Sequence, residues 1–227
     1  MKKNWLVFSL TLAFASAASL VHADIEADIE AGESKAAACV SCHGENGNSM
    51  VPTFPKLAQQ DESYLRKQLH AFKDGSRNNP VMSSIASSLS DKDMVDIAAY
   101  YMAQKISAND LPVINDDDDD DKPAVSDADK KAAMEKLMNE GSNLYRNGDI
   151  AREVSACIAC HGPLGEGNEP AAFPALRSQH ADYLIKTLTD FKNGIRSNNS
   201  ENMMHMITQK MTVEEIKAVS YRISMMK

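Results

Sequence analysis

The sequence Cys39-Val-Ser-Cys42-His43-Gly44 returns as Cys157-Ile-Ala-Cys160-His161-Gly162, 118 residues further along a chain of 227 residues. Three more patterns follow each copy in the same order, at an offset of 119 residues: Phe-Pro-x-Leu at 54–57 and 173–176, Tyr-Leu at 64–65 and 183–184, and Phe-Lys-x-Gly-x-Arg at 72–77 and 191–196. Landmarks that keep their order and offset indicate repeated structural units. The sequence therefore predicts two tandem copies of one domain.

Apolar residues within each copy recur at helical spacing. Tyr64, Leu65, Leu69 and Phe72 share one face, and positions 183, 184, 188 and 191 repeat it. Capping-type sequences at 90–93 and 212–215 precede the apolar segments 94–102 and 216–223. No run shows the alternation of a strand. We expect an all-α fold with three to five helices in each copy.

The repeated Cys-x-x-Cys-His sequence is the attachment signature of c-type haem. Two thiols three residues apart on one helical turn can each reach a vinyl group of the same porphyrin, and the following histidine can supply a nitrogen to the iron. A haem in each core would also explain an aromatic content of only 6%. We predict two covalently attached haem c groups, with attachment residues Cys39, Cys42, Cys157 and Cys160 and iron ligands His43 and His161.

Two other uses of these cysteines are considered. Redox dithiols usually belong to a βαβ context, which this sequence lacks. A zinc site shared by the two motifs would hold one metal ion and would not require a duplicated domain. The matched contexts of the two motifs favour haem.

Methionines at matched positions are the expected sixth ligands of the two irons. A thioether suits haem iron and raises its potential relative to a second histidine. Met82 follows the first copy's Phe-Lys-x-Gly-x-Arg pattern, and Met204 lies three residues later in the second copy. Met203, Met206 and His205 adjoin Met204, so they are competing ligands there.

Other polar residues have weaker expected roles. Backbone carbonyls of Pro55 and Pro174 can accept the ring N–H of the two motif histidines. Arg77 and Arg196 either neutralise a haem propionate or stand exposed without a partner. His70 and His180 are not matched between the copies and are expected to be ordinary surface or helix histidines.

The N-terminus has the features of an export signal. Lys2 and Lys3 precede an uncharged stretch over 5–21, and Ala23 offers a small residue for cleavage. This stretch is short and diluted for a membrane span, and no later segment is apolar enough to cross a bilayer. We expect a signal peptide at 1–23 and a soluble mature chain of 204 residues with a net charge of −10. Such an acidic chain is a poor candidate for binding nucleic acid.

An acidic linker is expected between the copies, over 107–130, with six aspartates at Asp116 to Asp121. Like charges in a row repel one another and favour an extended chain. The predicted domains are then 24–106 and 131–227. Their net charges are −4 and +1, and the linker carries −7.

The ordered duplicate resembles the dihaem cytochrome c4 family over residues 31–227. The resemblance implies two cytochrome-c-like domains related by a pseudo-twofold axis, with haem propionate edges meeting at the interface. It also implies periplasmic transport of electrons to a terminal oxidase. The six-aspartate run is not a feature expected from the family.

Three functions are compared on these grounds. The leading one is a periplasmic carrier of single electrons between membrane or periplasmic redox proteins, with peripheral membrane association allowed and no catalytic residues. A second is the electron-accepting cytochrome subunit of an oxidoreductase, such as a flavocytochrome sulfide dehydrogenase. A third is a dihaem enzyme, for instance a peroxidase or a thiosulfate-oxidising cytochrome. It would need an exchangeable iron site, whereas both copies offer a methionine.

Overall fold

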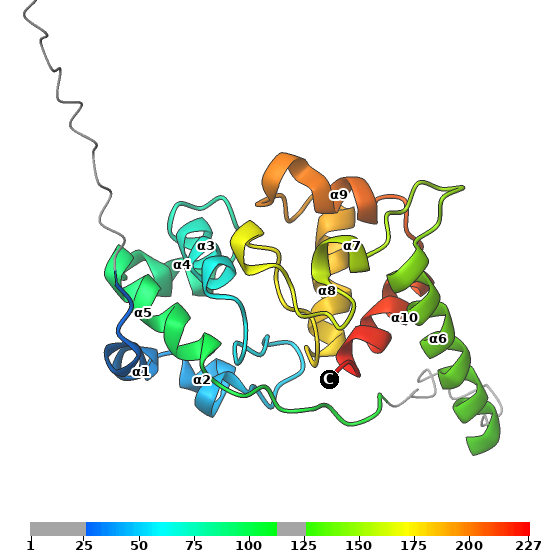
Figure 1. The fold of residues 1–227 in the computed structure, drawn as a ribbon, viewed down its shortest axis with the longest axis horizontal. Coiled ribbons are helices and arrows are strands. Elements are labelled where there is room, and N and C mark those ends of the chain that lie inside the picture. The colour runs from blue at the N-terminus through cyan, green and yellow to red at the C-terminus, as the bar shows by residue number, and fades with distance from the viewer. Residues whose placement is uncertain (1–25, 113–125) are drawn as a thin grey trace, which may run out of the picture.

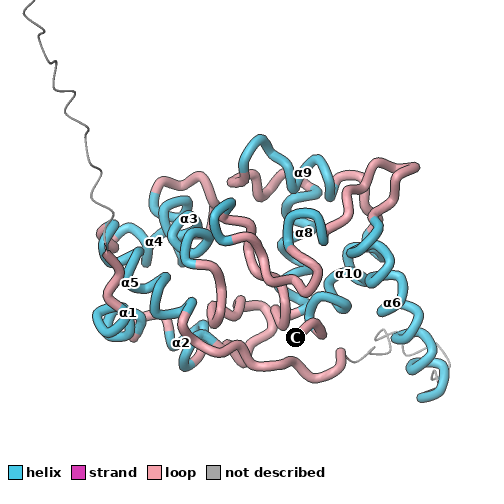
Figure 2. Tube along the Cα trace, viewed as in Figure 1, coloured by secondary structure: helices cyan, strands magenta, loops and turns pink. Residues whose placement is uncertain are grey.

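A computed structural model of the chain describes residues 26–112 and 126–227. Within these ranges the regular structure is helical, and the β-type pairing consists of two isolated bridges, Asp149–Val154 and Asn168–Phe173 (Figure 2). The predicted all-α fold is confirmed. The predicted signal peptide and the Asp116–Asp121 run lie outside the described residues.

The two repeats form two helical domains that lie side by side, the first blue to green and the second green to red in Figure 1. The described part of each contains five α-helices, at the upper limit of the prediction. The first has α1 (Ile29–Ala36), α2 (Val40–His43), η1 (Glu45–Gly47), α3 (Glu62–Lys73), α4 (Pro80–Ser87) and α5 (Asp91–Met102). The second has α6 (Asp127–Asn147), α7 (Ile158–His161), η2 (Glu169–Ala171), α8 (Ala181–Lys192), η3 (Ser200–Asn202), α9 (Met203–Thr208) and α10 (Val213–Ser224).

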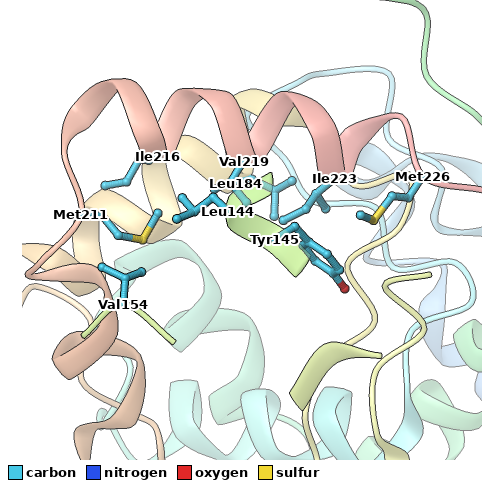
Figure 3. Close-up of a cluster of buried hydrophobic side chains, with 9 residues drawn as sticks. All are labelled: Leu144, Tyr145, Val154, Leu184, Met211, Ile216, Val219, Ile223 and Met226. Carbon is cyan, nitrogen blue, oxygen red and sulfur yellow. The ribbon is translucent and has the colours of Figure 1, made fainter. Parts of the chain in front are cut away.

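Each domain is built on the packing of its first helix against its last. Helix α1 packs on α5, and α6 packs on α10. In Figure 3, Ile216, Val219 and Ile223 of α10 extend toward Leu144 and Tyr145 of α6. Burying an aliphatic side chain of this size contributes about 1.5–3 kcal/mol. These apolar faces thus hold the ends of each repeat together, and the segments between them carry the motifs.

The last helix of each domain starts at the predicted cap. The Ser90 hydroxyl accepts from the Asp93 N–H, and the Asp93 carboxylate accepts from the Ser90 N–H. Thr212 and Glu215 make the same reciprocal pair. Such caps satisfy N–H groups that a helix start leaves unpaired and contribute about 1 kcal/mol.

The ends of the predicted linker are more ordered than an extended spacer. Helix α6 begins at Asp127, so the predicted boundary at residue 130 is too late by one helical turn. The Ser126 hydroxyl accepts from the Asp129 N–H at 3.2 Å, which starts the helix there. At the other end, the Asn109 side chain donates to the carbonyls of Ser178 and Ser224. The chain that leaves the first domain is therefore fastened to the second.

Candidate haem sites

Each Cys-x-x-Cys-His sequence forms one tight helical turn. The His43 N–H donates to the Cys39 carbonyl at 2.9 Å, and the His161 N–H donates to the Cys157 carbonyl at 2.9 Å. All four motif cysteines are free and partly exposed. Their thiols are therefore available for attachment, and the spacing places both thiols of a motif on the same turn as its histidine.

The glycine after each histidine lets the chain leave this turn. Gly44 has φ +75° and Gly162 has φ +77°, in the left-handed region that favours glycine. A Cβ on Gly44 would also lie 2.4 Å from the Asn48 carbonyl oxygen. The repeated sixth residue of the motif is thus required by the backbone.

Both motif histidines are buried and held by a proline carbonyl. The Nδ1–H of His43 donates to the Pro55 carbonyl at 2.9 Å, and that of His161 donates to the Pro174 carbonyl at 3.0 Å. Burial lowers the pKa of both rings, which keeps them neutral. With Nδ1 protonated, the Nε2 lone pair remains for a metal ion. The predicted role of the two prolines is confirmed.

The surroundings of the first cysteine in each motif are apolar. Cys39, like Leu57 and Leu69, packs against the core cluster of the first domain, and Cys157, like Leu176 and Leu188, packs against that of the second. These leucines are only partly buried. Burial raises the pKa of Cys39, and it raises the pKa of Cys157 to about 11. Two thiols, a neutral imidazole and half-covered apolar side chains fit a haem group in each domain.

The expected methionine ligands have similar local structure. The Met82 N–H donates to the Asn79 side chain at 3.1 Å, and the Met204 N–H donates to the Asn199 side chain at 2.9 Å. The three extra residues of the second repeat correspond in length to the turn η3, which immediately precedes α9. The Nδ1–H of the His205 ring donates to the Phe191 carbonyl at 2.7 Å. This contact leaves Nε2 free, as the proline contacts do for the two motif histidines, so His205 stays a competing ligand.

The repeated arginines cross between the domains. Arg77 Nη2 donates to the Tyr183 hydroxyl at 3.1 Å, and Arg196 Nη2 donates to the Tyr64 hydroxyl at 3.0 Å. Gln68 Oε1 accepts from both guanidinium groups at 2.9 Å. The expectation that these arginines stand exposed without a partner is wrong, because the interface covers them and supplies hydroxyl and amide acceptors in place of water.

The two unmatched histidines differ from each other. His70 lies on α3 with its side chain 44% exposed, as expected for a surface histidine. His180 lies at the start of α8, but its Nε2–H donates to the Ser49 carbonyl of the first domain at 2.9 Å. The sequence predicted an ordinary surface or helix histidine, so this contact at the domain interface was not predicted.

Sequence reasoning also missed two buried glutamines. Gln60 forms two hydrogen bonds with the backbone of Ala175, and Gln179 forms two with the backbone of Lys56. Gln60 and Gln179 differ by the repeat offset of 119, as do Lys56 and Ala175. The shared offset is the sequence feature that could have identified these four residues. It does not show that each glutamine binds a residue of the opposite domain.

A helical fold with two such sites defines a dihaem c-type cytochrome. The family model for cytochrome c matches residues 29–105 and 138–224. Cytochrome c4 of Pseudomonas aeruginosa is 41% identical over 218 residues, which cover 96% of this chain and 96% of that protein. The chain belongs to the cytochrome c4 family.

Solved structures and other relatives agree with this assignment. The crystal structure of reduced recombinant cytochrome c4 from Pseudomonas stutzeri superposes with a TM-score of 0.76 at 37% identity, covering 89% of this chain and all of that one. A thiosulfate dehydrogenase electron acceptor of Stutzerimonas stutzeri is 36% identical and covers 82% of this chain and 77% of its own length. The protein is thus a dihaem electron carrier rather than an enzyme, and its two motifs carry two covalent haem c groups.

Proposed function

We propose that this protein carries single electrons in the periplasm, from a respiratory donor toward a terminal oxidase. The observation that carries this proposal is the matched pair of sites, each with two thiols and a histidine held by a proline carbonyl, in domains joined across a hydrogen-bonded interface. Such a pair suits electron transfer, in which no substrate is bound. The protein then positions its haem groups and sets their reduction potentials.

Each haem has four proposed protein ligands or attachments. Cys39 and Cys42 would hold the first group through thioether bonds, and His43 and Met82 would bind its iron. The second group has the equivalent set Cys157, Cys160, His161 and Met204. When bound, haem supplies reversible one-electron chemistry at iron. The protein's part is to orient the imidazole through the proline carbonyl and to exclude water with apolar side chains.

Export to the periplasm is proposed from the signal-like sequence at 1–23. In the described part of the chain, no helix is both long and apolar enough to cross a membrane. Contact with a membrane redox complex would then be peripheral. The net charge of −4 on residues 24–106 and −7 on the linker suits a partner with a basic surface.

A second candidate function is supported by one relative. The Stutzerimonas stutzeri protein that is 36% identical is named a thiosulfate dehydrogenase electron acceptor. By analogy, this chain would accept electrons from an oxidoreductase and pass them on. The flavocytochrome sulfide dehydrogenase that the sequence analysis gave as an example would be an electron donor of the same kind. That it is a partner of this chain stays a proposal.

A redox titration followed by absorption spectra tests the proposed function. We expect two one-electron steps, low-spin spectra in both oxidation states, and the long-wavelength ferric band of methionine ligation for both haems. Purified terminal oxidase should oxidise the reduced protein, whereas rapid reduction by a thiosulfate-oxidising enzyme would favour the second candidate. A high-spin haem that binds carbon monoxide in the unmodified protein would contradict the carrier function and support a dihaem enzyme.

A further inference from the structure

The peptide group that orients His161 is held on its opposite side by the first domain. The Pro174 carbonyl, which accepts from His161 Nδ1 at 3.0 Å, belongs to the same peptide group as the Ala175 N–H. This N–H donates to Gln60 Oε1 at 2.8 Å, and Gln60 Nε2 donates to the Ala175 carbonyl at 2.8 Å. A continuous path of hydrogen bonds therefore runs from a first-domain side chain to the second-domain histidine.

The same path runs in the opposite direction. The Pro55 carbonyl accepts from His43 Nδ1 at 2.9 Å and shares its peptide group with the Lys56 N–H. That N–H donates to Gln179 Oε1 at 2.8 Å, and Gln179 Nε2 donates to the Lys56 carbonyl at 2.9 Å. Each domain thus supplies a glutamine to the histidine-bearing site of the other.

A peptide group transmits polarisation between its two ends. Resonance gives its C–N bond partial double-bond character, so an N–H that donates a hydrogen bond increases the negative charge on the carbonyl oxygen. Chains of hydrogen bonds strengthen one another, most of all where water is excluded. Gln60 and Gln179 are 6% and 5% exposed, and Lys56 and Ala175 are 3% and 8% exposed. Both paths therefore lie in a protected environment.

A stronger proline acceptor makes the histidine a stronger donor to iron. A hydrogen bond from the second ring nitrogen raises the basicity of a metal-bound imidazole. A more basic ligand favours the ferric state, so it lowers the reduction potential.

We infer that Gln60 and Gln179 are crossed positioning residues: Gln60 tunes the haem of the second domain through His161, and Gln179 tunes the haem of the first domain through His43. This inference rests on the proposed function, in which both histidines would bind haem iron. It gives the interface a role beyond holding the domains together, because each potential depends on contact with the neighbouring domain.

Substitution of each glutamine in the full-length protein with both haems attached tests the crossed assignment. Leucine has a similar volume and leaves the Ala175 or Lys56 backbone without a side-chain partner. In a spectroelectrochemical titration, Gln60→Leu should raise the potential of the second-domain haem and leave the first unchanged. Gln179→Leu should do the reverse. A shift in the variant's own domain, or equal shifts in both, would overturn the inference.

Two further measurements separate tuning from a general loosening of the interface. Met82→His identifies the first-domain step, because a second histidine lowers that potential. In the reduced protein, hydrogen exchange of the His161 Nδ1–H should be faster in Gln60→Leu and unchanged in Gln179→Leu. Ser63→Ala is the matched control: it removes the hydrogen bond across the interface between the Ser63 hydroxyl and the Glu169 carbonyl but touches neither proline peptide, so both potentials should stay unchanged.

The outcomes distinguish this inference from the proposed function. If the unmodified protein lacks histidine ligation at its haems, the proposed function fails and the crossed assignment falls with it. If ligation is intact but the shifts are not crossed, only the crossed assignment fails. Should leucine prevent folding, Gln60→Ala and Gln179→Ala leave the same backbone groups unpaired and carry the same expectation.

Discussion

Gly32 of α1 lies so close to α5 that a Cβ at this position would be 2.1 Å from the carbonyl oxygen of Asp96. The second domain repeats the contact, because a Cβ on Gly141 of α6 would lie 2.1 Å from the carbonyl oxygen of Ala218 in α10. Both glycines are buried within helices. The first and last helices of each domain can approach this closely only because these positions have no side chain.

A methyl group at either crossing should destabilise its domain. Gly32→Ala and Gly141→Ala must push two packed helices apart, and such overpacking costs about 1–3 kcal/mol, occasionally more. Alanine's better helix propensity returns only about 1 kcal/mol of this. Denaturant unfolding of the protein with both haems attached measures the change. Gly75→Ala measures the cost of backbone strain without a clash, because Gly75 has φ +81° and nothing within 4 Å of an added Cβ. The steric explanation is wrong if neither Gly32→Ala nor Gly141→Ala lowers the stability.

Loss of a methionine ligand should open one iron and leave the other intact. Met82→Ala is expected to convert the first haem to a high-spin form that binds carbon monoxide, since no thioether then fills the sixth position. Met204→Ala should do the same to the second haem. Absorption spectra with and without carbon monoxide report both. If Met204→Ala is silent and Met203→Ala or His205→Ala opens the second site instead, the assignment of Met204 is wrong.

Protonation of Asp61 should make stability depend on pH between about pH 4 and pH 6. Its Oδ2 is buried without a hydrogen-bond partner, beside Gly167 of the second domain. Burial raises the pKa of Asp61 to about 6, with a further contribution from Glu169 and an opposing one from Arg177. Because the folded pKa lies above the unfolded one, the stability that the protonated carboxyl contributes is lost as pH rises from about 4 through about 6.

Asp61→Asn isolates this effect. The variant should match the unmodified protein near pH 4 and exceed its unfolding free energy by about 1–2 kcal/mol at pH 7.5, less than the full shift implies because the carboxyl is partly exposed. Unfolding curves across this pH range give the difference. A difference that does not change with pH would show that Asp61 is not buried with a raised pKa.

The six-aspartate run should steer the encounter with a basic partner. Stopped-flow oxidation or reduction by the purified partner should slow steeply between low and physiological ionic strength, because salt screens exposed charges. Replacing Asp116 to Asp121 with Ser and Asn should flatten that dependence. Neutralising the exposed Glu135 and Glu214 of the second domain serves as the control and should have a smaller effect. A rate indifferent to salt and to the aspartates would leave the run as a spacer.

The sequence alone determined the two sites because their information is local. Two cysteines and a histidine within five residues, repeated in matched contexts, specify covalent attachment on one helical turn whatever the rest of the chain does. The periodic apolar residues and the capping sequences at Ser90 and Thr212 likewise depend on neighbours within a few residues. The proline carbonyls were predictable for a similar reason, since Pro55 and Pro174 follow their histidines by 12 and 13 residues.

Only the tertiary structure decided how the two domains meet. Gln60 and Ala175 are 115 residues apart, and the glutamine binds a backbone N–H and carbonyl, which every residue except proline possesses. A hydrogen bond to the backbone does not restrict the amino-acid type of the partner residue, so no pattern in the sequence could identify Ala175 as the partner of Gln60. The same holds for Gly32, whose reason for being glycine is the Asp96 carbonyl of another helix. Hydrophobic periodicity reports which face of a helix is covered, whereas the identity of the covering group depends on the packing of the whole chain.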